Sequence, residues 1–198
     1  MPRRRVVFSL LLFALTISAV AGCSKPKFYS YYPLDVSNQW TYAVTSYENI
    51  NRDVEERVIK RVGDNYYFNN KEVLLRLPQG IVNKMGVTIL RDPLELGEKW
   101  IESQMTLEIT AVGKTVEVPA GTFTDTVEIT WTTMYPGDVT IDPSVQPTLE
   151  PGDNPRVFIY ATTYAKNVGK IKEEYWIIQP DGTKTREVLA ELKSFNLR

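Results

Sequence analysis

Histidine is absent from the chain, and cysteine occurs once in its 198 residues. Without histidine the chain cannot form a Ser-His-Asp or Cys-His triad or bind zinc through imidazole, and one cysteine cannot form an intramolecular disulfide. No glycine-rich phosphate loop is present, because Gly113, Gly121, Gly169 and Gly182 all fall in predicted turns. The common catalytic chemistries are mostly excluded, and we expect no enzymatic activity, no cofactor and no metal site.

An excess of positive charge is also missing. The chain has 23 Lys+Arg against 24 Asp+Glu, with 43% hydrophobic and 24% charged residues. This composition is typical of one folded domain rather than of a disordered segment. Its near-neutral charge argues against nucleic acid as a partner.

A basic and then apolar segment begins the chain. Three arginines at positions 3 to 5 precede the apolar run Val6 to Val20, which has the length of a secretory signal and is short for a spanning helix. The run ends in Val20-Ala21-Gly22-Cys23, which resembles the lipobox of bacterial lipoproteins. The resemblance implies cleavage before Cys23 and acylation of its thiol; the alternative is an ordinary signal peptide with a free thiol, an unusual choice in an oxidising compartment.

The residue after the cysteine is Ser24, whereas many Gram-negative lipoproteins retained in the inner membrane have aspartate there. The same resemblance therefore implies a lipid-anchored protein of the cell envelope, delivered to the outer membrane. The mature chain has 20 Lys+Arg (23 minus the three signal arginines) against 24 Asp+Glu, a formal charge of −4. Such a charge does not favour binding to anionic lipid, so we expect the acyl chains to hold the protein to the membrane.

Beyond the signal peptide (residues 1–22) we expect a lipidated tether (residues 23–32) and a single β domain (residues 33–198). The tether is rich in aromatic residues such as Phe28, Tyr31 and Tyr32. These rings either lie at the level of the lipid headgroups or pack on the domain, and we favour packing.

Alternation of apolar and polar residues predicts strands through the rest of the chain, as in Trp40-Thr41-Tyr42 and Val127-Glu128-Ile129. Further strands are predicted at Asn65–Phe68, Glu72–Leu77, Val87–Leu90, Met105–Val112, Val157–Tyr164 and Ile171–Ile178. The segments Val54–Val62 and Val188–Phe195 fit a helical stripe or a strand, and we expect strands because turns flank both. The predicted fold is all-β, a curled antiparallel sheet or partly open barrel of about ten short strands.

One segment occurs twice, 60 residues apart. Pro33-Leu34-Asp35-Val36-Ser37-Asn38-Gln39-Trp40 and Pro93-Leu94-Glu95-Leu96-Gly97-Glu98-Lys99-Trp100 share a proline, a leucine, an acid, an aliphatic residue, a small turn residue and a tryptophan. We interpret the pair as one structural corner used twice, in which each tryptophan begins a strand. The alternative is a pair of loops that contact a ligand.

These segments, with Val118-Pro119-Ala120-Gly121-Thr122-Phe123, Tyr164-Ala165 before Val168-Gly169, and Glu191-Leu192 before Ser194-Phe195, resemble the uncharacterised TapB-like group of bacterial lipoproteins and exported proteins. The resemblance spans most of the mature chain and implies an antiparallel, partly barrel-like sheet with no established enzymatic activity. Its best motif, Val118 to Phe123, predicts a turn at Pro119-Ala120-Gly121 between two strands. The chain departs from the group at Lys166-Asn167 and by a long insertion after Tyr135.

That insertion, residues 136–155, contains five of the twelve prolines and four acidic residues but no lysine or arginine. Five prolines cannot join a central strand ladder, so we expect a long loop. A solvated surface loop is the favoured interpretation, and a partner-binding loop is the alternative. Its acidic residues do not have the spacing of a calcium loop.

Two carboxylate pairs, Glu55-Glu56 and Glu173-Glu174, are the candidates for acid–base hydrolysis. Neighbours on a strand point to opposite faces, so we expect each pair to have one inward and one outward member and to be structural. The solvated face of a hairpin strand is expected to carry Lys170, Lys172, Glu173 and Glu174.

Tryptophans at four positions are the remaining candidates for ligand binding: Trp40, Trp100, Trp131 and Trp176. At strand spacing such rings are usually core, but they can also line a concave face that stacks on sugars or holds an acyl chain. We expect a non-catalytic module that binds or scaffolds something in the envelope, with the membrane and an envelope protein as partners. A carrier or sensor of an apolar ligand in a half-open barrel is the alternative, and a carboxylate-based hydrolase is third.

Overall fold

The computed structural model describes residues 27–102, 105–135 and 155–198. In these residues a 3-10 helix, η1 (Lys27–Tyr31), precedes fourteen strands. Twelve form one antiparallel sheet in the order β6-β5-β4-β3-β2-β1-β14-β13-β12-β11-β8-β7. Its strands are β1 (Gln39–Ser46), β2 (Asn51–Val62), β3 (Asn65–Phe68), β4 (Val73–Leu77), β5 (Gly80–Asn83), β6 (Thr88–Arg91), β7 (Lys99–Glu102), β8 (Met105–Val112), β11 (Thr126–Tyr135), β12 (Arg156–Ala165), β13 (Gly169–Ile178) and β14 (Lys184–Asn196). The other two strands, β9 (Val116–Val118) and β10 (Gly121–Phe123), pair in a small hairpin.

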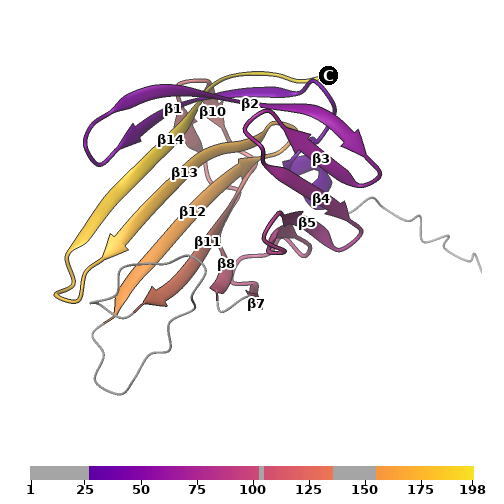
Figure 1. Cartoon of the computed structure of the whole chain (residues 1–198). Coiled ribbons are helices and arrows are strands. Elements are labelled where there is room, and N and C mark those ends of the chain that lie inside the picture. Colours follow the sequence, from indigo (N-terminus) through magenta and orange to yellow (C-terminus); the bar gives the residue numbers. More distant parts are fainter. Residues whose placement is uncertain (1–26, 103–104, 136–154) are drawn as a thin grey trace, which may run out of the picture.

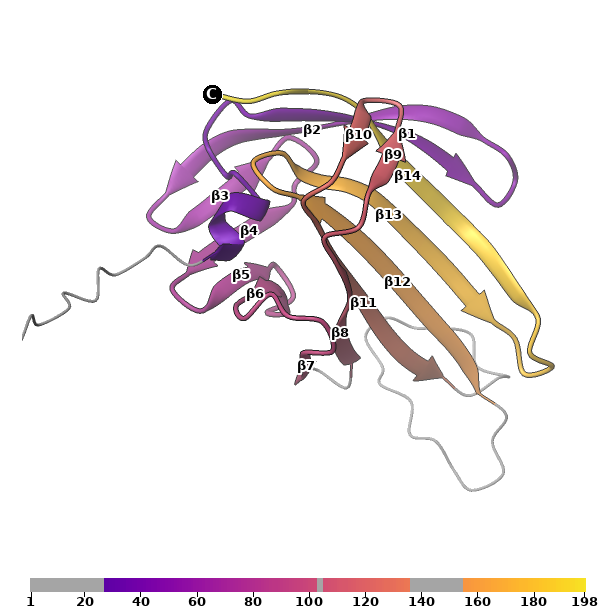
Figure 2. The same cartoon turned by 180° about the vertical axis from the view of Figure 1, so that it is seen from behind.

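The large sheet curls into a nearly closed barrel. The long strands β11 to β14 form one wall, and β2 continues across one end into β3, β4 and β5 opposite that wall (Figures 1 and 2). The two edge strands, β6 and β7, leave one open seam. Across it, the backbone N–H of Thr88 donates to Glu102 Oε2 at 2.5 Å, and Trp100 Nε1 donates to the carbonyl of Thr88 at 2.9 Å. Side chains thus bind peptide groups that an edge strand would otherwise leave exposed.

The structure confirms the predicted all-β fold, but it contains more strands than the expected ten or so. The strand that the sequence did not predict is β5, whose two apolar residues, Ile81 and Val82, are adjacent and so do not alternate. The corner predicted β7, which contains Trp100, and the turn at Pro119-Ala120-Gly121 predicted β9 and β10.

Both ambiguous segments are strands, β2 and β14, and local irregularities explain their helix-like patterns. In β2 the register shifts between Val58 and Lys60, where its partner changes from β1 to β3, and Val58 is its only buried residue. In β14 the register shifts near Lys193 and again near Glu187, opposite β1 and β13. Each bulge adds a residue on one strand, which interrupts the alternation of inward and outward side chains.

The repeated segment forms the same corner twice, as the sequence predicted. Ser37 and Gly97 occupy equivalent positions and have φ values of 82° and 84°. Three backbone hydrogen bonds recur with nearly equal lengths: Ser37 N to Val58 O (2.8 Å) and Gly97 N to Ile109 O (2.8 Å); Asn38 N to Asp35 O (3.0 Å) and Glu98 N to Glu95 O (3.1 Å); Val58 N to Asn38 O (3.0 Å) and Ile109 N to Glu98 O (2.9 Å). Each corner thus leads into a strand, β1 or β7, that pairs with the next strand of the chain.

Both corner tryptophans are buried and make the same kind of hydrogen bond. Trp40 is fully buried, and its Nε1 donates to the carbonyl of Val168 at 2.6 Å. Trp100 is 5% exposed, and its Nε1 donates to the carbonyl of Thr88. The two rings are therefore core residues that also bind backbone from another strand or turn.

The aromatic residues before Pro33 pack on the domain, as the sequence predicted. Phe28, Tyr31 and Tyr32 are all buried in the core. The turn at Asn167, where the chain departs from the resembled group, holds η1 in place: its backbone N–H donates to the carbonyl of Ser30 at 2.5 Å. Packing of the domain thus includes Phe28, upstream of the expected boundary at Pro33.

The predicted turn at Pro119-Ala120-Gly121 is confirmed, since it joins β9 to β10. The proline-rich segment lies outside the described residues up to position 154, as do the signal peptide and Cys23. The strands on either side of that segment, β11 and β12, pair from Thr126–Ala165 to Tyr135–Arg156.

Candidate functional site

A cavity of about 310 Å³ lies inside the barrel between the β11–β13 wall and the facing β3–β6 hairpins. Its inner lining is aromatic or aliphatic, and its rim and one side are polar and charged. The lining residues are Tyr32, Glu56, Phe68, Asn70, Glu72, Leu74, Asn83, Lys84, Met85, Ile89, Trp131, Thr162, Tyr164, Lys170 and Glu173. Asn70, Lys84 and Met85 are exposed, so the turns that carry them form the rim, whereas Phe68, Leu74 and Tyr164 are buried.

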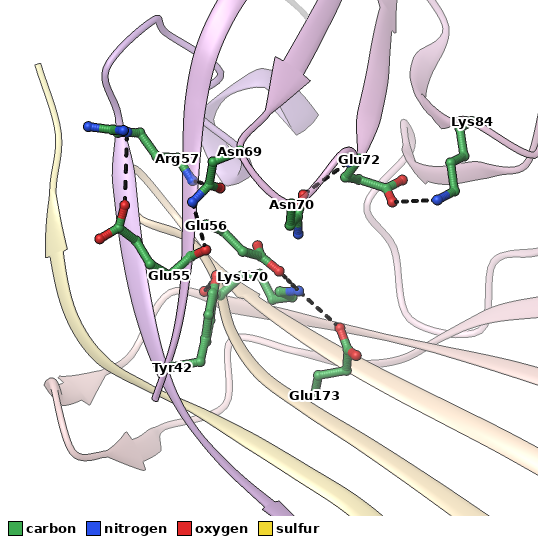
Figure 3. A network of polar contacts seen from close by, with 10 residues as sticks. All are labelled: Tyr42, Glu55, Glu56, Arg57, Asn69, Asn70, Glu72, Lys84, Lys170 and Glu173. Atoms are coloured by element: carbon green, nitrogen blue, oxygen red, sulfur yellow. Dashed lines mark hydrogen bonds and ion pairs between the residues drawn. The ribbon is translucent and has the colours of Figure 1, made fainter. Parts of the chain in front are cut away.

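The polar side of the cavity is formed by Lys170, Glu56 and Glu173, which we call the Lys170 cluster. Lys170 Nζ lies 3.1 Å from Glu56 Oε1 on β2 and 3.1 Å from Glu173 Oε2 on β13 (Figure 3). The ammonium also lies 4.9 Å from the centroid of the Tyr42 ring. The side chains of Lys170 and Glu56 are 16% and 15% exposed, and that of Glu173 is 37% exposed. The cluster therefore joins two distant strands at a largely dry position.

The inward position of Lys170 follows from a bulge at the start of β13. Thr163 pairs with Lys172 and Tyr164 pairs with Lys170, so the register shifts between them. The adjacent residue, Ile171, is fully buried. A bulge of this kind redirects side chains that strict alternation would send to opposite faces.

Burial and the neighbouring charges shift the pKa values of the lysine and of two tyrosines at this site. Desolvation alone would lower the pKa of Lys170, but the carboxylates of Glu173 and Glu56 outweigh it and hold that pKa well above its ordinary value. Burial also raises the pKa of the Tyr32 and Tyr42 hydroxyls well above the ordinary value, and the Glu56 carboxylate adds to the effect. Lys170 thus stays protonated at neutral pH.

The carboxylate pairs divide between the two faces of the sheet as predicted. Glu56 and Glu173 line the cavity, while Glu55 and Glu174 do not. Glu174 instead pairs with Lys172 at 3.2 Å and Arg186 at 3.4 Å. The expectation that Lys170 belongs to a solvated hairpin face was wrong, because the bulge turns Lys170 inward and the curl of the sheet brings Glu56 of β2 to it. Glu173, from the same predicted face, is partly solvated.

A second ion pair spans the rim. Lys84 Nζ, in the turn between β5 and β6, lies 3.7 Å from Glu72 Oε2 beside the start of β4 (Figure 3). The backbone N–H of Glu72 donates to Asn70 Oδ1 at 3.0 Å. Because Lys84 is exposed, this pair contributes little to stability, and its position suits it to contact with a bound molecule.

The four candidate tryptophans occupy three different environments. Trp40 and Trp100 are buried core residues and do not line the cavity. Trp131 on β11 lines it, with its ring centroid 5.9 Å from that of Tyr160. Trp176 does not line it; its ring lies under the cations of Lys184 and Arg186, at 4.3 and 5.6 Å. Of the four, the structure brings only Trp131 together with the cavity.

The Lys170 cluster itself was not predicted, since its members are 114 and 3 residues apart in sequence. In the part of the chain that the structure describes, no helix is long and apolar enough to cross a membrane. The same residues contain no group of three or more potential His, Cys, Asp or Glu metal ligands. The expected absence of a cofactor or metal stays a prediction.

No protein-family model matches the chain, and no curated protein matches its sequence. Among solved structures, a candidate exported protein with a YmcC-like fold from Bacteroides fragilis is similar, with a TM-score of 0.50 and 11% identity, over 85% of this chain and 99% of its own. A candidate lipoprotein from Parabacteroides distasonis has a TM-score of 0.48 and 11% identity, over 87% and 100%. The first of these likenesses shows that the chain shares the YmcC-like fold. The resemblance to the TapB-like group stays a prediction.

Proposed function

We propose that the protein is a lipid-anchored binding protein of the bacterial outer membrane, whose barrel holds a small ligand without transforming it. The lipobox ending at Cys23 and the serine that follows it support the anchor and its destination. The fold supports the compartment, because the Bacteroides protein that shares it is described as exported. The resemblance to the TapB-like group of lipoproteins points the same way.

The cavity beside the Lys170 cluster is the observation that carries the binding function. Its volume of about 310 Å³ is at the small end of the range for ligand pockets. Its lining divides about equally between aromatic or aliphatic side chains and polar or charged ones, so it is more polar than a typical ligand pocket and suits a polar ligand. The ion pairs of Lys170 hold the polar side together, so the site is formed before a ligand arrives.

The charged lining favours binding of a polar ligand over the other candidate functions. A carrier of a purely apolar ligand would place that ligand against Glu56, Glu173 and Lys170, at a cost in desolvation. A hydrolase would need one carboxylate to carry a proton, whereas Glu56 and Glu173 both bind the ammonium of Lys170. Binding without catalysis agrees best with this arrangement.

Mass spectrometry of the mature N-terminus tests the anchor. We expect a diacylated or triacylated Cys23 in the wild type, and a soluble or uncleaved form of Cys23→Ser. Ser24→Asp is the matched sorting variant: it keeps the lipid and is expected to shift the protein to the inner-membrane fraction. An unmodified Cys23, or cleavage at another residue, would refute the lipid anchor.

Extraction of small molecules from protein purified out of native membranes tests the binding function. Thr162, on the cavity floor, is replaced by phenylalanine, and Ile159→Phe on the same strand is the matched control outside the cavity lining. We expect a compound that accompanies the wild type and Ile159→Phe and is lost from Thr162→Phe. Equal recovery from all three proteins would show that the cavity is not the binding site.

A further inference from the structure

We propose that the ligand of this cavity is a small, cyclic organic cation, of the size and type of an amino sugar. The inference rests on the proposed function, namely that the cavity binds a ligand, and it names the class of that ligand. Three observations carry it: the charge of the cavity, the pairing of Lys170, and a tryptophan in the lining.

The charge of the lining favours a cation. Three carboxylates line the cavity, from Glu56, Glu72 and Glu173, against two ammonium groups, from Lys84 and Lys170. Lys84 pairs with Glu72 at the rim, so Lys170 is the one lysine of the lining that forms ion pairs with Glu56 and Glu173. Among the described residues no other cation lies within ion-pair distance of either carboxylate, and one negative charge is left uncompensated. Charge of this kind in a partly dry cavity attracts a cation and repels an anion.

Lys170, the buried lysine of the lining, is unsuited to capture an anionic ligand. Two ion pairs of 3.1 Å occupy the ammonium of Lys170, and the Tyr42 ring lies over it at 4.9 Å. An anion would have to replace Glu56 or Glu173 and leave that carboxylate unpaired, which is costly in a low-dielectric site. Glu173, at 37% exposure, is by contrast the member of the cluster with room to accept a second partner.

Trp131 supplies the complementary feature, because its side chain lines the cavity. The face of an indole ring attracts a cation and stacks on the apolar face of a sugar ring. An ammonium group beside Glu173 and a saturated ring against Trp131 together define a small, cyclic, positively charged molecule.

Three probes that share one pyranose ring separate charge from shape: glucosamine, which is a cation, N-acetylglucosamine, which is neutral, and glucuronic acid, which is an anion. Binding to the purified, detergent-solubilised lipoprotein is measured by calorimetry and by tryptophan fluorescence. We expect glucosamine to bind at least about 10-fold more tightly than either of the other two, a difference of about 1.4 kcal/mol.

Paired variants assign the effect to the cavity. Glu173→Gln is expected to weaken glucosamine binding about 10-fold and to leave N-acetylglucosamine unchanged, whereas Glu174→Gln, its neighbour outside the cavity lining, should change neither. Trp131→Leu removes the aromatic face but keeps an apolar side chain, and it is expected to weaken glucosamine and N-acetylglucosamine alike. Denaturant melts of each variant establish that the fold is retained.

Equal or tighter binding of glucuronic acid, an unchanged affinity in Glu173→Gln, or no binding of any probe would each overturn the inference. These results are distinguishable from failure of the proposed function. If Thr162→Phe loses a natural compound while the three probes show no charge preference, the cavity is a binding site but its ligand is not a cation. If Thr162→Phe binds glucosamine as tightly as the wild type, binding lies elsewhere and both proposals fail.

Discussion

Replacement of the two corner tryptophans measures how far the repeated segment is structural. Trp40 is fully buried; its ring packs against Phe68 at 6.4 Å and Tyr32 at 5.8 Å between centroids. Removal of a buried tryptophan side chain costs about 3–5 kcal/mol, and the central position of Trp40 predicts a value near the upper end. Trp100 has one face against the Arg91 guanidinium, 4.8 Å away, and belongs to an edge strand. Because an edge can relax more easily, Trp100→Ala should cost about 3 kcal/mol.

The phenylalanine variants isolate the hydrogen bond. Trp40→Phe keeps most of the buried ring but leaves the carbonyl of Val168 without the donor that now lies 2.6 Å away, at a cost of about 1–3 kcal/mol. Urea unfolding of the purified protein is the assay, with stability read from the midpoint at constant slope. Either alanine variant within about 0.5 kcal/mol of the wild type would refute the structural interpretation, since such small changes are typical of surface positions.

Three further predictions concern the second corner, the cluster and the long segment. Gly97→Ser should lower stability by about 1 kcal/mol because its φ of 84° strains a side chain, while Ser37→Gly should change it by less, and thermal melts that show the reverse order would contradict the equivalence of the corners. Lys170→Met should cost about 2–3 kcal/mol at neutral pH, because it leaves Glu56 and Glu173 unpaired and Glu173 is partly solvated. Folding raises the pKa of Lys170, so the stability that the wild type gains from this lysine is complete below the ordinary lysine pKa of 10.5 and is lost as the pH rises through the higher folded pKa. The difference in urea midpoint between the wild type and Lys170→Met should therefore shrink as the pH rises through that range. A difference that stays constant would contradict the prediction. Replacement of residues 137–154 by a short turn should leave the melting temperature nearly unchanged, because β11 and β12 already pair along their whole length, and a variant that fails to fold would show that the segment is part of the core.

The sequence predicted those elements whose signal is local. Long strands such as β8 and β11 alternate over eight and ten residues, and the corners carry a proline, a turn residue and a tryptophan in fixed order. The short strand β5 was missed because its apolar residues are adjacent and show no alternation. Bulges explain why β2 and β14 resembled helices, since a bulge interrupts the period without ending the strand.

The candidate site could be predicted only in part, and the reason is its mode of assembly. Alternation along a strand was enough to expect that one member of each pair, Glu55-Glu56 and Glu173-Glu174, points inward. Which lysine meets them depends on the bulge beside Tyr164 and on the curl that carries β2 over β13. The division of the tryptophans has the same origin, because Trp131 and Trp40 have similar strand contexts in sequence and differ in which layer covers them.

The sequence by itself determined the class of the fold, the twin corners and the expectation of a lipid at Cys23, because each depends on residues that are neighbours in the chain. The tertiary structure alone decided that a cavity exists, that Lys170 lies between Glu56 and Glu173, and that Trp131 faces the cavity while Trp40 is core. The pairing of charges across 114 residues is set by the curl of the sheet from β2 through β1 and β14 to β13, in which the register of each strand pair adds to that of the previous one. A shift of one residue in the pairing of any two of these strands would turn Lys170 away from its partners. No pattern within one stretch of the sequence specifies the combined register of several strand pairs.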